Sequence, residues 1–158
     1  MIHVVDWGFT CPRDSVVRRQ WIREKKRDTI EKLRQHNLEV ECRDFEKVCE
    51  RIRESYAVFK RPKWLMIAVT KADLFMDDLN EAQAYYHPKV ESPFTRILKE
   101  QLLDKVGDQH ITCRAMPVSA WDMNFEWNGE VVPSNIGGTN EARALFRNFL
   151  QALAVLEA

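Results

Sequence analysis

WLMIAVTKAD, residues 64–73, is the most informative stretch of this sequence. The run from Trp64 to Thr70 is almost entirely apolar, and an uninterrupted run of this kind is typical of a strand that is buried on both faces of a parallel sheet. The polar residues after it mark the carboxyl end of that strand. Ligands of open parallel sheets bind beyond the carboxyl ends of the strands, so a site is expected at this turn.

Two more strands are predicted, one on each side of this stretch in the chain. Ile2 to Val5 is a short apolar run that ends at Asp6, and His110 to Val118 is interpreted as the third strand. Helical patterns separate the strands, and strands that alternate with helices form parallel sheets with right-handed crossovers. A chain of 158 residues is also the length of one domain. We therefore predict an α/β fold for residues 1–158, with one three-layer domain in which helices flank a short, mainly parallel sheet.

Helices and a hairpin fill the rest of the chain. The clearest helical stripe runs from Phe45 to Tyr56, where apolar residues repeat at the spacing of one helix face. Asn128-Gly129 stands between Phe125-Glu126-Trp127 and Glu130-Val131-Val132 and predicts a two-residue hairpin turn. Residues 75–92 are polar and are expected to be irregular. Helices are predicted at about 13–35, 44–60, 93–106 and 139–156.

Composition limits the classes of function. Lys and Arg together number 24, as do Asp and Glu, so the chain has no overall positive field that would favour nucleic acid as a partner. The four cysteines form no Cys-x-x-Cys pair, which fits thiols of a reducing compartment. No apolar run reaches the roughly 18 residues of a membrane span, and the first residues lack the pattern of a signal peptide. We expect a cytoplasmic protein without a transmembrane segment.

Two short motifs follow predicted strands. TKAD occupies residues 70–73, after the second strand, and SAW occupies residues 119–121, after the third. They resemble the base-recognition motifs of the GTPase superfamily, which uses Asn-Lys-x-Asp or Thr-Lys-x-Asp after one buried strand and Ser-Ala-Lys or a variant after the next. The spacing of one helix and one strand also matches. The resemblance implies the carboxyl-terminal half of a P-loop GTPase domain and a guanine nucleotide, GTP or GDP, as its ligand.

The chemistry of these residue types agrees with base recognition. Guanine presents N1–H and N2–H donors on one edge, and the carboxylate of Asp73 would accept both. Adenine lacks that edge, so the same carboxylate would be left unpaired against it. Lys71 would lay its aliphatic stem along the purine and keep its ammonium in water. The backbone N–H of Ala120 would donate to guanine O6.

The other residues of the two motifs have supporting roles in this interpretation. The hydroxyls of Thr70 and Ser119 would tie the two loops together by hydrogen bonds. Trp121 replaces the Lys of the family motif, and its indole either stacks on a base or covers an edge of the core. The predicted base site consists of Thr70, Lys71, Asp73, Ser119, Ala120 and Trp121.

Hydrolysis is not expected from this chain alone. The sequence lacks the family's phosphate loop, GxxxxGK[ST], so the amino-terminal, phosphate-binding half of the domain would be missing. Phosphate contacts normally supply much of the affinity and stabilise the transition state. We predict no catalytic residue and no metal site, and weak binding near the millimolar range, at about −4 kcal/mol. Mg²⁺ would bind only where a partner supplies the phosphate site.

An uncovered strand edge points to a protein partner. In a complete sheet of this family, the strand at residues 2–5 lies beside the strand of the phosphate loop. Without that neighbour its backbone groups are unpaired, and an apolar edge strand is an association site. We expect a protein partner or self-association through this edge. Two other functions stay open on this basis: a non-catalytic interaction module, or one piece of a two-piece GTPase.

The stretch from Val17 to Lys32 is locally basic. It would contact an acidic partner, lipid headgroups or RNA, or it is a solvated helix face. If the helix face is solvated, its own acidic residues, Glu24, Asp28 and Glu31, pair with its Lys and Arg side chains.

Overall fold

The computed structural model describes residues 1–60, 64–119 and 122–157. It is a mixed α/β structure built on a three-stranded sheet. Strands β1 (Ile2–Val5), β2 (Trp64–Val69) and β3 (Thr112–Pro117) pair in parallel in the order β1-β2-β3. The three predicted strands and their parallel pairing are confirmed. β1 and β3 form the two edges of this sheet in the described part of the chain.

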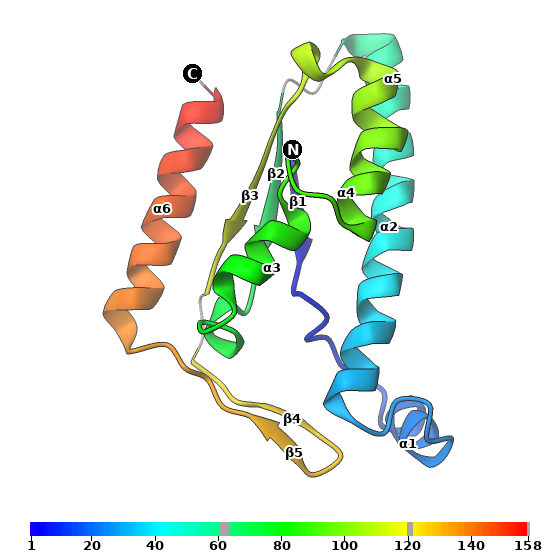
Figure 1. The fold of residues 1–158 in the computed structure, drawn as a ribbon, viewed down its shortest axis with the longest axis vertical. Helices are drawn as coiled ribbons and strands as arrows, with labels where there is room; N and C mark the ends of the chain where they lie inside the picture. The colour runs from blue at the N-terminus through cyan, green and yellow to red at the C-terminus, as the bar shows by residue number, and fades with distance from the viewer. Residues whose placement is uncertain (61–63, 120–121, 158) are drawn as a thin grey trace.

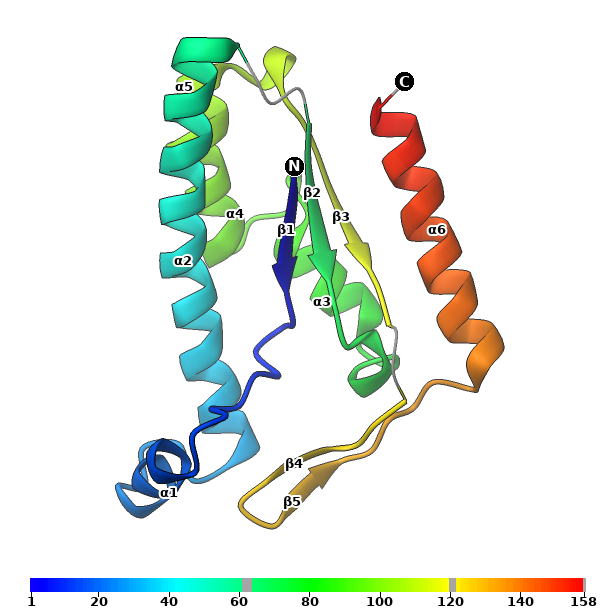
Figure 2. The same ribbon diagram turned by 180° about the vertical axis from the view of Figure 1, so that it is seen from behind.

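Helices cover both faces of the sheet, which gives three layers (Figure 1, Figure 2). One face carries α6 (Thr139–Glu157), which runs alongside β3. The other face carries several helical segments: α2 (Ile30–Phe59), α3 (Leu79–Tyr86), α4 (Pro93–Ile97), a π-helical stretch (Leu98–Leu103) and α5 (Asp104–Val106).

Two hydrophobic clusters form, one on each face of the sheet. Leu65 and Ile67 of β2 belong to the larger cluster, which lies against α2, α3 and α4. Met66 and Ala68 belong to the smaller cluster under α6, because neighbouring residues of a strand face opposite sides. All four side chains are buried. A strand that is covered on both faces has to be apolar throughout, which is why the run at 64–70 is uninterrupted.

The first helical region differs from the prediction. Asp14 caps a short helix, α1 (Ser15–Arg23), and a turn with Lys25 at φ 51° separates it from α2. α2 then continues for 30 residues. The prediction of two helices that meet near residues 36–43 is therefore wrong, since the interruption lies at 24–29 instead.

Contacts with distant residues explain this difference. Asn37 lies between the two predicted helices, but in the structure it is buried inside α2, and its amide donates to the carbonyls of Gly8 and Thr10 at 2.7 Å each. The turn before α2 is held by the hairpin, because the indole of Trp127 donates to the carbonyl of Arg27 at 2.7 Å. A helix boundary that depends on partners so far along the chain leaves no local signal.

α3 was also missed by sequence patterns. Residues 75–92 are not irregular throughout, because 79–86 form a helix whose Ala82 and Tyr86 are buried in the larger cluster. A short 3-10 turn, Ala72–Leu74, follows the end of β2 after two intervening residues. The 3-10 turn contains the last two residues of the TKAD motif, and α3 begins five residues after that turn.

The predicted start of α4, the end of the helical run at Gly107 and the hairpin are confirmed, whereas β3 begins at Thr112 and not at the predicted His110. Ser92 and Thr95 form a capping box at the start of α4, and Gly107, at φ 93°, follows the end of α5. A short 3-10 turn, Asp108–His110, leads into β3. The hairpin pairs β4 (Phe125–Trp127) with β5 (Glu130–Val132) in antiparallel fashion around Asn128-Gly129.

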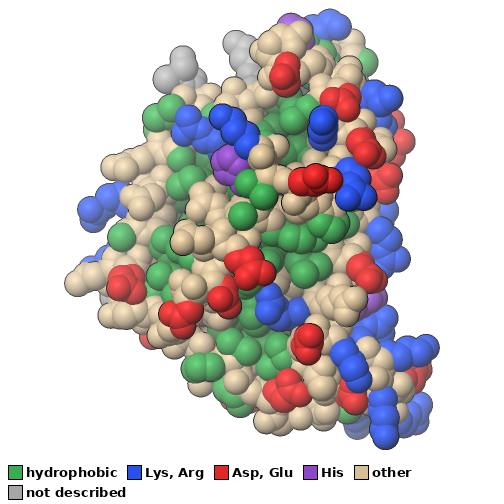
Figure 3. Space-filling model, in the orientation of Figure 1, with side chains coloured by type: hydrophobic (Ala, Val, Ile, Leu, Met, Phe, Trp, Pro, Cys, Tyr) green, Lys and Arg blue, Asp and Glu red, His purple; other side chains and the backbone are tan. Residues whose placement is uncertain are grey.

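The basic stretch surrounds α1 and the turn after it. Lys and Arg side chains gather with a few acidic ones over this end of the molecule (Figure 3). Lys32 lies 2.8 Å from Asp28, and Lys26 lies 3.8 Å from Glu24. Such exposed pairs contribute little to stability, and they agree with the solvated alternative.

Among the described residues, none of the helices has the length and apolar character that crossing a membrane requires.

Candidate functional site

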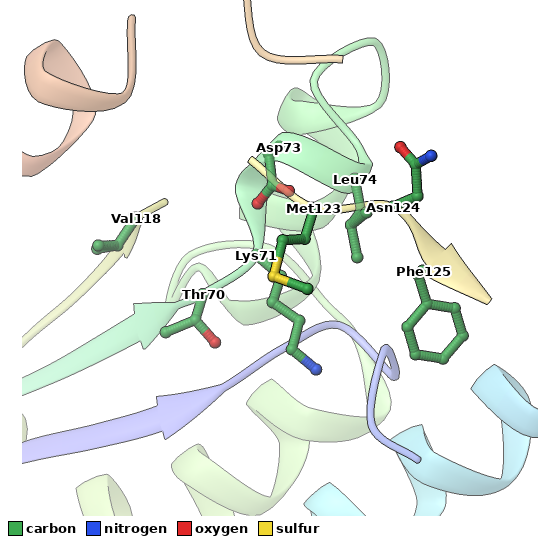
Figure 4. Close-up of a pocket in the computed structure, with 8 residues that line it drawn as sticks. All are labelled: Thr70, Lys71, Asp73, Leu74, Val118, Met123, Asn124 and Phe125. Carbon is green, nitrogen blue, oxygen red and sulfur yellow. The ribbon is translucent and has the colours of Figure 1, made fainter. Parts of the chain in front are cut away.

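A cavity opens at the carboxyl ends of β2 and β3, where the sequence predicts a site (Figure 4). Its volume is about 630 Å³, and its walls come from the turn after β2, the end of β3 and the segment that leads into the hairpin. Most of the lining is apolar. The lining residues are Thr70, Lys71, Asp73, Leu74, Val118, Met123, Asn124 and Phe125.

Asp73 is the buried carboxylate of this cavity. Its side chain is held from both sides, because the hydroxyl of Ser119 donates to Oδ1 at 2.8 Å and the hydroxyl of Ser134 donates to Oδ2 at 3.1 Å. The residue is only 4% exposed. A carboxylate oxygen has two lone pairs, so each oxygen keeps further acceptor capacity beyond its serine. The Asp73–Ser119 bond joins the two predicted motifs.

Backbone hydrogen bonds fix the loops around Asp73. The N–H of Ala72 donates to the carbonyl of Val118 at 3.2 Å, and the N–H of Asn135 donates to the carbonyl of Asp73 at 2.7 Å. The first bond joins the ends of β2 and β3, and the second closes the loop after the hairpin over the same point. The carboxylate therefore has a defined position before any ligand arrives.

Lys71 differs from its predicted role. Its backbone is left-handed, at φ 57°, and its side chain reaches the segment after β1 (Figure 4). The ammonium lies 2.8 Å from Oδ2 of Asp6 and donates to the carbonyl of Phe9. The ammonium, which was expected to be held in water, therefore has two protein partners as well. The aliphatic stem still lines the cavity, and 41% of the side chain stays exposed.

Thr70 also has a different partner from the expected one. Its hydroxyl donates to the carbonyl of Val5 at 2.9 Å, and its N–H donates to the same carbonyl at 2.8 Å. Thr70 thus joins β2 to β1. The hydroxyl of Ser119 joins the two motif loops, as predicted, and the hydroxyl of Thr70 does not. The predicted positions Ala120 and Trp121 lie outside the described residues.

The cavity contains aromatic and apolar residues that the motifs do not include. Phe125 of β4 forms one wall, with Met123 and Leu74 near it. The ring of Phe125 meets the ring of Phe9 edge-on, with 5.4 Å between the centroids, and Lys71 Nζ lies 5.9 Å from the Phe125 centroid. The Asn-Gly hairpin signal locates β4 in the sequence. It gives no indication that the hairpin leads back to the end of β2.

A buried acidic network lies behind the cavity, at the end of β1. Oδ2 of Asp6 accepts from Lys71 and from the hydroxyl of Thr10, while Oδ1 is buried and has no partner among the described residues. Asp6 is the first residue after β1, and its carbonyl accepts from the N–H of Phe9 at 3.0 Å. The network therefore links the cavity wall to the sheet.

Glu41 of α2 holds the same loop from the other side. Its Oε1 accepts from the N–H of Asp6 at 3.3 Å and from the N–H of Gly8 at 3.0 Å, and Oε2 accepts from the hydroxyl of Tyr86. Burial raises the pKa of Glu41 to about 7, and the nearby Asp6 charge acts in the same direction. Glu41 therefore titrates in the neutral range.

The described residues contain no group of three or more His, Cys, Asp or Glu side chains placed to hold a metal ion. Fold and site together define a mixed α/β protein with a partly apolar cavity at the carboxyl ends of its parallel strands. In comparisons with known proteins, no family model, no curated protein and no solved structure matches this chain.

Proposed function

We propose that the cavity binds the base of a guanine nucleotide. The observation that carries this proposal is the position of Asp73, a buried carboxylate fixed by Ser119 beside a largely apolar cavity at two strand ends. A volume of about 630 Å³ lies in the range of small-molecule sites. The resemblance of TKAD and SAW to the base-recognition motifs of GTPases supports the same ligand.

The chemistry of recognition follows from Asp73. A carboxylate with spare lone pairs is complementary to an edge that offers two adjacent donors, as guanine N1–H and N2–H do. The stem of Lys71 and the ring of Phe125 supply apolar surface for the flat faces of a purine. The hydroxyl of Ser134 occupies one carboxylate oxygen in the structure, so a base would share that oxygen or displace this hydroxyl.

Binding is expected to be weak and hydrolysis absent for the chain alone. The sequence has no GxxxxGK[ST] loop to hold phosphates and Mg²⁺. Base contacts without phosphate contacts give a dissociation constant near the millimolar range, or about −4 kcal/mol. Hydrolysis that arises only after a separate phosphate-loop protein is added would support the two-piece alternative.

A nucleoside titration followed by ¹⁵N–¹H NMR tests the proposal. We expect guanosine to shift the amides of the cavity, inosine to shift them at higher concentration because it lacks the N2 amino group, and adenosine to leave them unchanged. The Asp73→Asn variant is expected to lose the guanosine response. Asp78→Asn, which removes an exposed carboxylate of the same loop, is the matched control and should respond like the unmodified protein.

The outcomes separate the candidate functions. Guanosine-selective shifts that depend on Asp73 support a base site. Equal shifts with guanosine and adenosine refute recognition through the carboxylate. No shift with any nucleoside at about 10 mM, far above the expected dissociation constant, would leave the interaction module as the better interpretation.

A further inference from the structure

Within the described part of the chain, the outer edge of β1 has backbone groups without a partner, in a defined register. The carbonyls of Met1 and Val5 accept from the N–H groups of Met66 and Thr70, at 2.9 and 2.8 Å, so the odd-numbered residues of β1 bond to β2. Backbone groups of successive strand residues point to opposite sides. The N–H and C=O groups of Ile2 and Val4 therefore point to the open edge.

The next position along this edge is already closed. The N–H of Asp6 points the same way as those of Ile2 and Val4, and it donates to Oε1 of Glu41 at 3.3 Å. Glu41 thus ends the row of free groups on the carboxyl side of β1. The backbone that can still pair with another strand is therefore that of Ile2 and Val4, with two N–H donors and two C=O acceptors.

A groove runs beside this edge, between β1 and α2. Its volume is about 270 Å³. A strand that pairs with β1 would place every second side chain here, on the same face as His3 and Val5. The lining residues are His3, Val4, Val5, Thr10, Asn37, Val40, Glu41 and Asp44.

The groove has an acidic and hydrogen-bonding character. Asp44 supplies an exposed carboxylate, and Glu41 lies beside it, with oxygens that already accept from Asp6, Gly8 and Tyr86 and a pKa that burial raises to about 7. The buried Nε2 of His3 has no hydrogen-bond partner among the described residues. Burial lowers the pKa of His3, so its ring is neutral near pH 7. Lys47 pairs with Asp44 at 3.0 Å, but both side chains are largely exposed, so this ion pair is weak. A cationic side chain is complementary to this set.

The opposite face of the edge is apolar. Ile2 and Val4 are 44% and 62% exposed, whereas their register partners on β2, Met66 and Ala68, are buried under α6. α6 therefore stops short of β1. Apolar side chains of an added strand would lie beside Ile2 and Val4 on this face and cover surface that is now in water.

We propose that the edge of β1 binds an extended segment of another polypeptide, in which Lys or Arg side chains enter the groove at Asp44, beside Glu41, while the alternate side chains are apolar. The pairing uses the backbone of Ile2 and Val4. This inference is independent of the base site, because the two surfaces share no lining residue.

A peptide titration tests it. The probe is fluorescein-labelled Thr-Val-Lys-Val-Lys-Val-Thr, and binding is followed by anisotropy and by amide shifts of Ile2 and Val4. Val4→Pro removes one outward N–H that the β1–β2 ladder does not use, and we expect it to weaken binding by about tenfold or more. Val4→Thr, which keeps the N–H and the branched shape, is the matched control and should stay within about threefold of the unmodified protein.

The side-chain preference has its own test. The peptide with Glu in place of both Lys residues should bind at least about tenfold more weakly, and the Asp44→Lys variant should narrow or reverse that preference. Circular dichroism and the dispersion of the ¹⁵N–¹H NMR spectrum verify that Val4→Pro is folded. Unchanged peptide binding by folded Val4→Pro, or equal binding of the Lys and Glu peptides, overturns the proposal. The proposal is also overturned if light scattering shows that the unliganded chain is a dimer and that Val4→Pro abolishes the dimer. The occupant of the edge would then be a second copy of the chain.

Discussion

The ammonium of Lys71, which follows β2, lies 2.8 Å from Oδ2 of Asp6, which follows β1. The Asp6 side chain is only 12% exposed, so water screens its charge poorly. The pair therefore clamps the ends of two neighbouring strands at the wall of the cavity. Because Lys71 also belongs to the TKAD motif, one side chain serves both the frame of the fold and the proposed base site.

Removing the ammonium tests this clamp. Lys71→Met keeps the length of the stem but leaves the Asp6 carboxylate without its counter-charge. We expect the free energy of unfolding to fall by about 1–3 kcal/mol, less than for a fully buried pair because Lys71 is partly exposed. Urea unfolding at pH 7 measures it. Adding Asp6→Asn to Lys71→Met should recover part of the loss; a double variant that is as unstable as both losses combined would argue against the ion pair as the cause.

The two serines on Asp73 should differ in their effect. Ser119 is 2% exposed and Ser134 is less deeply placed, so Ser119→Ala removes the better-buried hydrogen bond. We expect Ser119→Ala to lower stability by about 1–2 kcal/mol and Ser134→Ala by less than about 1 kcal/mol. Thermal unfolding of both variants checks the order. Equal losses would mean that burial does not distinguish the two bonds.

Two glycines with nearly the same backbone angle form a matched pair. Gly8 has φ +82° and Gly129 has φ +83°, but a Cβ at Gly8 would lie 2.8 Å from the carbonyl oxygen of Arg34, whereas a Cβ at Gly129 meets nothing within 4 Å. We expect Gly129→Ala to cost about 1–2 kcal/mol from backbone strain. Gly8→Ala adds a clash with backbone in α2 and should cost about 2 kcal/mol more. Denaturant unfolding compares the two, and equal losses would contradict the close approach.

Glu41 should make stability depend on pH. Its pKa is about 7 in the folded protein and 4.5 ordinarily, so between these values the folded state binds more protons than the unfolded state. Stability then falls as pH rises through this window and is regained as pH falls. The two pKa values differ by about 2.5 (7 − 4.5), so at about 1.4 kcal/mol per pKa unit we expect a contribution of about 3 kcal/mol across the whole window.

Glu41→Gln isolates this contribution. The amide keeps an oxygen for the N–H groups of Asp6 and Gly8 but does not titrate. The quantity to measure is the difference in unfolding free energy between the two proteins from pH 4.5 to pH 8. His3 acts in the opposite direction, since burial lowers its pKa, but it is present in both proteins and cancels. A difference that is constant with pH would refute the raised pKa.

Strong local patterns were enough to predict much of the architecture. The run at 64–70 gave β2, the Ser92-Pro93 pair gave the start of α4, and Asn128-Gly129 gave the hairpin. Each depends on residues within a few positions of one another. The break at 24–29 and the helix α3 were missed, because the first depends on hydrogen bonds from the hairpin and the second on burial of Ala82 and Tyr86.

The candidate site divides in the same way. The sequence by itself determined that Asp73 and Ser119 follow two parallel strands. Each strand is marked by its own residues, and the residues after it lie at its carboxyl end. Only the tertiary structure decided that Lys71 binds Asp6, 65 residues away, and that Phe125 closes the cavity. The physical reason is that such pairs share no local geometry in the chain. They meet only when burial of the sheet and of α2 brings distant segments to the same strand ends.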